Sequence, residues 1–138
     1  MKRLGKQQPR YMFFLNPYTD ARFTSCPQCG GQVRQRKLPI VIHIGEPMQL
    51  IALNKTCRFC SDCELLIAHA DQLATFFAAF FGESRKAVTT DDYLVVGTID
   101  RRDWARKPAT PDELFAVLHD FKRVVSFKPA PTWVLKPK

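Results

Sequence analysis

The sequence lacks any run of about 18 apolar residues, the length that a membrane-spanning helix needs. Its basic opening, MKRLGKQQPRYMFFLNPY, contains only the short apolar patch YMFFL, and no small-residue cleavage site follows, which argues against a secretory signal. Internal repeats and low-complexity tracts are missing as well. These absences predict a cytoplasmic protein without membrane contact, and 138 residues suffice for one compact unit with its own core.

Acidic residues are scarce in the first part of the chain. Residues 1–58 contain ten Lys and Arg against two acids, whereas residues 59–138 contain eleven of each kind, so the whole net charge of +8 comes from the first part. This excess is compatible with contact to nucleic-acid phosphates. Alternatively, the cations only balance nearby metal-bound thiolates. The candidate nucleic-acid-binding residues are Arg34, Arg36, Lys37, Lys55 and Arg58.

The five cysteines are an odd number, and disulfides are rare in a reducing compartment, so clustered thiols favour a metal site. Cys26 and Cys29, in TSCPQCGG, have the Cys-x-x-Cys spacing that lets two sulfurs bind one tetrahedral metal. Gly30 suits the tight turn that follows them. These two cysteines are therefore predicted to form half of a four-thiolate site.

The other half has two possible compositions, because KTCRFCSDCELLIAH contains two overlapping pairs of the same spacing, Cys57/Cys60 and Cys60/Cys63. Cys57 lies on an alternating strand pattern, whereas two polar turn residues separate Cys60 from Cys63. A turn is where a pair of metal ligands is needed, so Cys60 and Cys63 are favoured. Cys57 remains the alternative to Cys63, or else a half-buried free thiol.

Alternating and β-branched patterns predict strands in RYMFFLNPY, GQVRQRKLPIVIHI, MQLIALNKTCRFC, CELLIAH and YLVVGTI. The period changes in ADQLATFFAAFFGES, which predicts an amphipathic helix with Asp71 as its cap and Gly82 at its end. A second helix is predicted to start at Thr110 and to run through ELFAVLHDFKRV. The charged run DRRDWARKPA reads as a turn, and the Pro-rich C-terminal segment as an extended stretch packed through Phe127, Trp133 and Leu135.

The pattern CPQCGG, followed by two strands and CSDCELLI, resembles a zinc ribbon, a four-cysteine β module common in transcription, translation and RNA-processing proteins. The resemblance covers roughly residues 22–70. It implies one structural Zn²⁺ ion with no open coordination position, and it specifies metal and local fold far better than activity. Two departures are Glu64, where many ribbons have Gly, and the extra Cys57.

These patterns together predict an α+β fold, in which a three-stranded antiparallel zinc ribbon joins a small helix and strand subdomain. Residues 1–10 are expected to be a basic flexible tail, residues 11–70 the ribbon with a preceding strand, and residues 71–138 a companion segment packed on it. The whole is expected to form one compact unit.

Three functions are compatible with this fold. The first is a non-catalytic zinc-binding module whose basic surface contacts DNA or RNA, with Phe59 or Tyr11 stacking on a base. The second is a scaffold that binds another protein through its aromatic helix or Pro-rich segment. The third and weakest is an enzyme that uses the carboxylates of Asp100 and Asp103. No motif points to a small-molecule substrate, and a non-enzymatic protein is expected.

Overall fold

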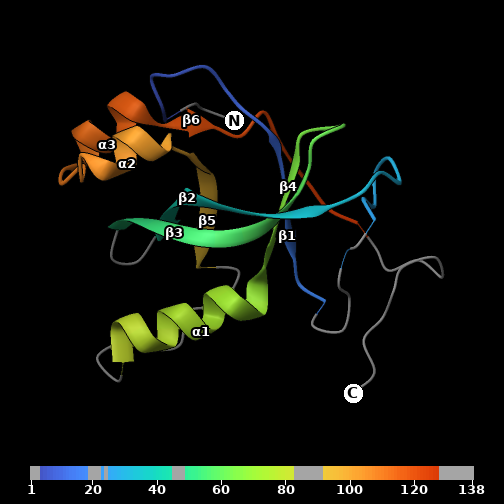
Figure 1. Ribbon diagram of the computed structural model, residues 1–138. Coiled ribbons are helices and arrows are strands. Elements are labelled where there is room, and N and C mark those ends of the chain that lie inside the picture. Colours follow the sequence, from blue (N-terminus) through green and yellow to red (C-terminus); the bar gives the residue numbers. More distant parts are fainter. Residues whose placement is uncertain (1–3, 19–22, 24, 45–48, 83–91, 128–138) are drawn as a thin grey trace.

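The computed structural model describes residues 4–18, 23, 25–44, 49–82 and 92–127. Within these ranges the protein has an α+β fold with one curled seven-stranded sheet and three helices (Figure 1). No helix in the described part is long and apolar enough to cross a membrane. The helices are α1 (Ala70–Phe81), α2 (Arg101–Ala105) and α3 (Pro111–Val117). The strands are β1 (Met12–Asn16), β2 (Arg34–Ile44), β3 (Gln49–Cys60), β4 (Leu65–His69), β5 (Tyr93–Thr98), β6 (His119–Asp120) and β7 (Arg123–Val125).

Strands β2 and β3 form a long antiparallel hairpin at the centre of the sheet. Their register runs from Arg34 opposite Phe59 to Ile44 opposite Gln49. The apolar end of β2, residues 40–44, lies in the core, whereas residues 34–37 of the same strand are exposed. The hairpin therefore has an inner apolar half and an outer polar half, which extends towards the cysteine pairs.

The three antiparallel strands predicted from the sequence are β2, β3 and β4, but they do not stand alone. In the sheet order β6-β5-β2-β3-β4-β1-β7 they form the middle of a larger sheet. Strand β5 pairs with the free side of β2, and β1 pairs in parallel with β4. The ribbon-like part and the companion segment consequently share one hydrogen-bonded sheet.

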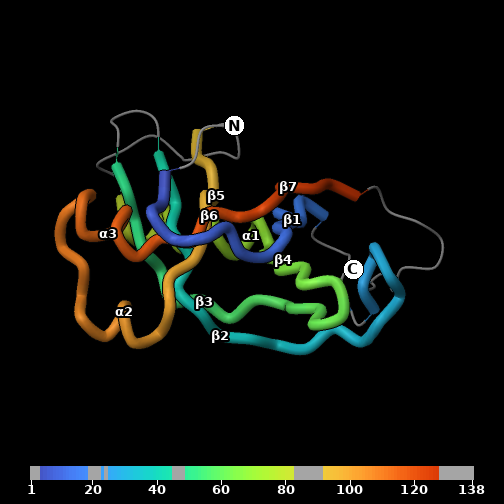
Figure 2. The backbone as a smooth tube through the Cα atoms, turned by 90° about the horizontal axis from the view of Figure 1, so that it is seen from above, coloured from blue at the N-terminus to red at the C-terminus, as the bar shows by residue number. Residues whose placement is uncertain are grey.

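The sheet curls until its two outer strands belong to the same short segment. Strand β6 pairs with β5, strand β7 pairs with β1, and only Phe121 and Lys122 lie between β6 and β7. Backbone hydrogen bonds from Phe121 N to Val96 O and from Lys122 N to Tyr11 O continue this double pairing. Figure 2 shows residues 119–125 as one continuous stretch that joins the two edges.

Helices cover both faces of the sheet (Figure 1). Leu73 and Phe77 of α1 are buried against Ile40 and Ile42 of β2 on one face. On the other face, Leu114 of α3 is buried in a cluster with strand residues of β2 and β5. Burying a side chain such as Phe77 contributes about 2–3 kcal/mol to folding, so α1 is held mainly by its apolar side.

Helix α1 confirms the predicted amphipathic segment, with a correction at its start. Gly82 ends the helix with a positive φ of 58°, as predicted. The capping position, however, is His69, and Asp71 lies within the first turn, where its negative charge still suits the helix dipole.

Two predictions for the C-terminal part are wrong. Residues 101–105 of the predicted charged turn form helix α2. Helix α3 has the predicted Thr110 cap but ends at Val117 rather than continuing to Val124, because Leu118 has an extended backbone and residues 119–125 form strand pairs. The predicted contacts of Trp133 and Leu135 lie outside the described residues, whereas Phe127 packs edge-on against Phe14.

The first described residues lie along the segment that follows α3. Both carboxylate oxygens of Asp120 accept backbone hydrogen bonds, from Leu4 N at 3.0 Å and from Gly5 N at 2.6 Å. Arg10 N also donates to Asp120 O at 2.8 Å. Residues 4–10, expected from composition to be flexible, are thus hydrogen-bonded to the sheet, and they bring the Arg10 side chain to a fixed place.

Candidate metal centre and basic surface

Two short turns hold four of the five cysteines at the outer end of the sheet. Cys26 and Cys29 lie in a turn that is closed by hydrogen bonds from Gly30 N to Cys26 O and from Cys26 N to Gly31 O. Cys60 is the last residue of β3, and Cys63 lies in the turn before β4. The hairpin therefore delivers its second cysteine pair where the chain reverses direction.

The residue after each cysteine pair has the same unusual backbone conformation. Gly30 has φ 77° and Glu64 has φ 56°, so both turns leave the second cysteine through the left-handed region. Glycine adopts this region freely, whereas the conformation is energetically unfavourable for a residue with a Cβ. The departure at Glu64 therefore leaves the turn geometry of a glycine knuckle in place. The Glu64 carboxylate lies 3.5 Å from Lys122 Nζ.

The four sulfurs are close enough to bind one metal ion. The Sγ atoms of Cys26, Cys29, Cys60 and Cys63 all lie within 4.8 Å of one another. Two cross-turn distances, Cys26 to Cys63 and Cys29 to Cys60, are 3.5 Å. Ligands about 2.3 Å from a central zinc ion lie roughly 3.8 Å apart in a tetrahedron. The cluster thus has the size of a four-thiolate site.

The surroundings of the sulfurs also suit thiolate ligands. Gln28 N donates to Cys26 Sγ and Gly31 N donates to Cys29 Sγ, both at 3.4 Å. Gly31 fits tightly between the turns, because a Cβ there would lie 2.6 Å from the Asp62 carboxylate and 3.3 Å from Cys29 Sγ. Backbone donors and close turn packing are what a thiolate centre requires.

The thiols perturb one another strongly. Burial and the neighbouring Cys26 and Cys60 raise the pKa of Cys63 far above the ordinary thiol value. Burial also acts to raise the pKa of Cys60, but hydrogen bonds from the Cys63 backbone and the Cys29 side chain outweigh it and lower that pKa. Four thiolates this close repel one another, and a bound cation would remove that repulsion.

Cys57 lies apart from this cluster. It pairs with Arg36 across the hairpin, is 2% exposed, and belongs to the large apolar cluster under α1. Its Sγ faces the Lys55 carbonyl at 3.8 Å, and burial raises its pKa to about 11. Cys57 is therefore an unreactive buried thiol, because burial in the core keeps it protonated.

The predicted basic residues gather around the outer half of the β2–β3 hairpin, where three grooves adjoin one another. The largest, of about 580 Å³, runs between β3 and the start of α1. The second, of about 370 Å³, lies between β2 and the loop before α2, and the third, of about 520 Å³, lies beside the cysteine turns. Gln35, Arg36 and Lys37 each line two of the grooves. The cations that line them are Arg10, Arg34, Arg36, Lys37, Lys55, Arg58 and Arg101, against the acids Asp62 and Asp100.

The aromatic side chains proposed for base stacking are already engaged. The guanidinium carbon of Arg36 lies 4.8 Å from the ring centre of Phe59 and 5.4 Å from that of Tyr11. These two rings are in edge-to-face contact at 5.0 Å, and Tyr11 is only 7% exposed. Their visible role is to support Arg36 by cation–π contact, a role that the sequence did not indicate.

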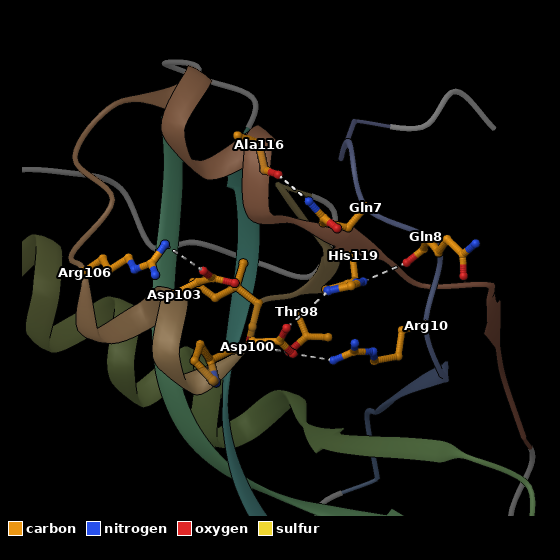
Figure 3. A network of polar contacts seen from close by, with 11 residues as sticks. Gln7, Gln8, Arg10, Thr98, Asp100, Asp103, Arg106, Ala116 and His119 are labelled. Atoms are coloured by element: carbon orange, nitrogen blue, oxygen red, sulfur yellow. Dashed lines mark hydrogen bonds and ion pairs between the residues drawn. The ribbon is translucent and has the colours of Figure 1, made fainter.

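The two carboxylates of the possible enzyme site face different partners (Figure 3). Asp100 Oδ1 accepts from Arg10 Nη1 at 2.6 Å, and its Oδ2 lies 3.7 Å from Nε2 of the buried His119. Asp103 lies 3.9 Å from Arg106. The hydrogen bond from Arg10, helped by the charges of Arg10 and His119, lowers the pKa of Asp100 despite some burial. Asp100 lines the second of the three grooves described above, and Asp103 lines none of these three.

The aromatic side of α1 is only partly buried. Phe77 is 1% exposed, Phe76 is partly buried, and Phe80 is 57% exposed. Phe77 therefore belongs to the core, whereas the Phe76 and Phe80 rings stack on each other with their centres 5.6 Å apart and form a smaller, partly exposed aromatic patch. A comparison of the chain with protein-family models, curated proteins and solved structures found no match.

Proposed function

We propose that the protein is a non-catalytic nucleic-acid-binding module in which one zinc ion clamps the outer end of a basic β-hairpin. The observation that carries this proposal is the set of three adjoining grooves around that hairpin, lined by seven cations and two acids. Closely spaced cations on one surface attract the phosphates of a nucleic acid. The fold supplies the surface, and the metal keeps its outer end in shape.

Zinc is the metal that this donor set favours. Four cysteine thiolates in a tetrahedron suit zinc, and they would occupy every coordination position. A closed site leaves no place for water or substrate on the ion, so the metal would have a structural role. The resemblance to zinc ribbons supports the same assignment.

The cations exceed what a zinc–thiolate centre needs for charge balance. Arg34 and Arg58 lie close to the cysteine turns and serve that purpose well. Lys37, however, lies opposite Thr56, four residues before Cys60, which places it roughly 13 Å along the strand from the centre at about 3.3 Å per residue. This distance exceeds the screening length of about 8 Å at physiological salt. The outlying cations are therefore available to an external partner.

The test is the salt dependence of binding to DNA and RNA single strands of about ten nucleotides with 5′-hydroxyl ends. With several phosphates contacted, the logarithm of affinity should fall steeply with the logarithm of salt concentration, by about 0.7 for each phosphate. The double variant Lys37→Gln with Lys55→Gln, which removes two cations away from the cysteine turns, should reduce this slope by roughly 1.4 while keeping its metal. No association at low salt, or an unchanged slope, would refute the proposal.

The matched control is Arg102→Gln with Arg106→Gln. It removes the same charge from exposed positions outside the three grooves. If long-range attraction alone drives binding, both double variants should lose the same affinity for the strand. If the hairpin contacts the strand, only the first variant should lose affinity. Metal content and thermal unfolding, measured on every variant, exclude misfolding as the cause.

A further inference from the structure

The groove between β2 and the loop before α2 is assembled from three distant parts of the chain. Arg10 and Tyr11 come from the segment before β1, residues 36–38 from β2, and residues 98–101 from the end of β5 and the start of α2. Tyr11, Leu38, Thr98 and Ile99 are buried and form its floor. At about 370 Å³ it reaches the size of small-ligand sites.

This groove concentrates positive charge. Arg10, Arg36, Lys37 and Arg101 line it together with a single carboxylate, Asp100, so its formal charge is +3. No carboxylate among the described residues forms an ion pair with Arg36, Lys37 or Arg101. Within the described part of the chain, these three cations therefore have no acidic partner of the kind that their charge would attract.

The three arginines are held in place before any ligand arrives. Arg10 is fixed by Asp100 at 2.6 Å, and an N–H group of Arg101 donates to Lys37 O at 3.0 Å. Arg36 lies over two aromatic rings. A guanidinium has five N–H donors, so each of these contacts leaves donors free for a ligand. Preorganised donors bind with a smaller loss of side-chain entropy.

The backbone at the groove is strained. Tyr11, a bulky residue, has φ 64°, in the left-handed region. Its carbonyl accepts from Lys122 N, and the preceding Arg10 N donates to Asp120 O, so pairing on both sides enforces the turn. This conformation directs Arg10 and Tyr11 into the groove. Backbone strain of this kind concentrates where a fold builds a binding site.

We propose that this groove binds a phosphate monoester, namely the terminal phosphate of a nucleic-acid strand or of a mononucleotide. A phosphate monoester has a charge of −1.5 to −2 at pH 7 and three acceptor oxygens, which match clustered guanidinium donors. A phosphodiester inside a strand carries one charge and continues on both sides. Because the floor of the groove is buried, a ligand that ends in the groove fits better than a strand that continues on both sides. The case in which the bound phosphate is the end of a nucleic-acid strand rests on the proposed function.

The experiment compares strands of about ten nucleotides that differ only in a 5′-phosphate, a 3′-phosphate or hydroxyl ends, together with a nucleoside monophosphate. A phosphorylated end should tighten binding by about tenfold, which is the contribution of one charge-assisted hydrogen bond. Arg101→Gln should abolish this advantage, and Arg106→Gln, an exposed neighbour outside the groove, should keep it. Equal affinities of all strands, with no binding of the monophosphate, would overturn the inference.

The outcomes separate this inference from the proposed function. If hydroxyl-ended strands bind with a steep salt dependence and a terminal phosphate adds nothing, the binding module stands and the phosphate site does not. If the monophosphate binds in an Arg101-dependent manner and no strand binds, the phosphate site stands and its ligand is a small molecule. An advantage that persists in Arg101→Gln would also refute the site, because the phosphate would then lie elsewhere.

Discussion

At the scale of single residues, the clearest contrast is between Cys57 and Cys63. Cys63 lies in the four-sulfur cluster, whereas Cys57 is buried under α1. We expect Cys63→Ser to lose the metal and to destabilise the outer end of the sheet, because three thiolates cannot complete the site. Cys57→Ser should retain one metal ion per chain. Elemental analysis of the purified variants measures both.

The Cys57→Ser variant also needs a stability measurement, because a hydroxyl replaces a thiol in an apolar cluster. We expect its free energy of unfolding to fall by about 1–2 kcal/mol with the metal still bound. The assignment of the ligands would be reversed if the Cys57→Ser protein is folded but free of metal while the Cys63→Ser protein retains metal.

A second residue-scale prediction concerns pH. Arg10 holds the pKa of Asp100 below its usual value, so the pair stabilises the fold above the ordinary carboxyl pKa of about 4 and loses this contribution as the pH falls through the lowered pKa. Both side chains are about one-third exposed, so Asp100→Asn should cost only about 0.5–1 kcal/mol at pH 7. Urea unfolding at pH 7 and at about pH 3 measures the difference, which should shrink at the lower pH.

The control for this pair is Asp103→Asn, which removes a longer contact to an Arg106 side chain that is 78% exposed. Its effect should be close to zero at both pH values. A pH-independent loss in Asp100→Asn would show that the side chain acts through packing or neutral hydrogen bonds instead of through its charge.

At the scale of elements, the second cysteine turn places Glu64 in a backbone conformation that is unfavourable for a residue with a side chain. Glu64 has φ 56°, which costs a residue with a Cβ about 1 kcal/mol. Glu64→Gly should therefore stabilise the protein by about 0.5 kcal/mol, after the loss of its exposed ion pair with Lys122 and the greater freedom of unfolded glycine.

Chemical denaturation of the metal-bound protein tests this, with Lys122→Gln as the control for the ion pair alone. That variant should lie within about 0.5 kcal/mol of the parent protein. If Glu64→Gly instead costs more than about 1 kcal/mol, the Glu64 side chain contributes more through its contacts than its backbone conformation costs.

Most elements could be predicted from sequence, and the error at the end of α3 has a clear physical cause. Strand alternation, the aromatic periodicity of α1 and the Thr110 cap are local signals, and each identified its element. The segment 118–125 contains no glycine or proline, so it reads as more helix, yet the unpaired edges of β1 and β5 draw it into extended pairing. Such pairing is set by residues far away in the chain, which a local pattern does not contain.

At the scale of the molecule, the same distinction applies to the candidate sites. Spacing and turn residues identified the four clustered cysteines, because both halves of the metal centre are local turns. Charge counting identified the basic half of the hairpin. Neither could place Arg10 or Arg101 beside Lys37, because only the curled sheet brings these three segments together. Arg101 even belonged to a run that reads as a solvated turn.

A molecule-scale prediction follows from the distribution of the buried clusters. Of the four clustered cysteines, Cys26 and Cys60 belong to the apolar cluster at the outer end, Cys63 packs against that cluster, and none belongs to the two clusters beneath the helices. Removal of the metal by a chelator, or by acid that protonates the thiolates, should loosen residues 25–36 and 57–64 and leave β5 and α3 folded.

Amide hydrogen exchange measures this directly. Protection in the outer hairpin should fall by at least about tenfold on chelation and return when Zn²⁺ is added back, while amides of β5 keep their protection. If protection is lost throughout the sheet, the metal stabilises the whole fold and not the outer hairpin alone.

The double pairing of residues 119–125 also bears on how the protein is made. Strands β1 and β7 pair Met12 with Arg123, about 110 residues apart, so one side of β1 has no partner until that segment leaves the ribosome. The outer edge of β5 waits for the same residues. During synthesis the nascent chain therefore presents two open strand edges at once, and a single late segment of seven residues covers both.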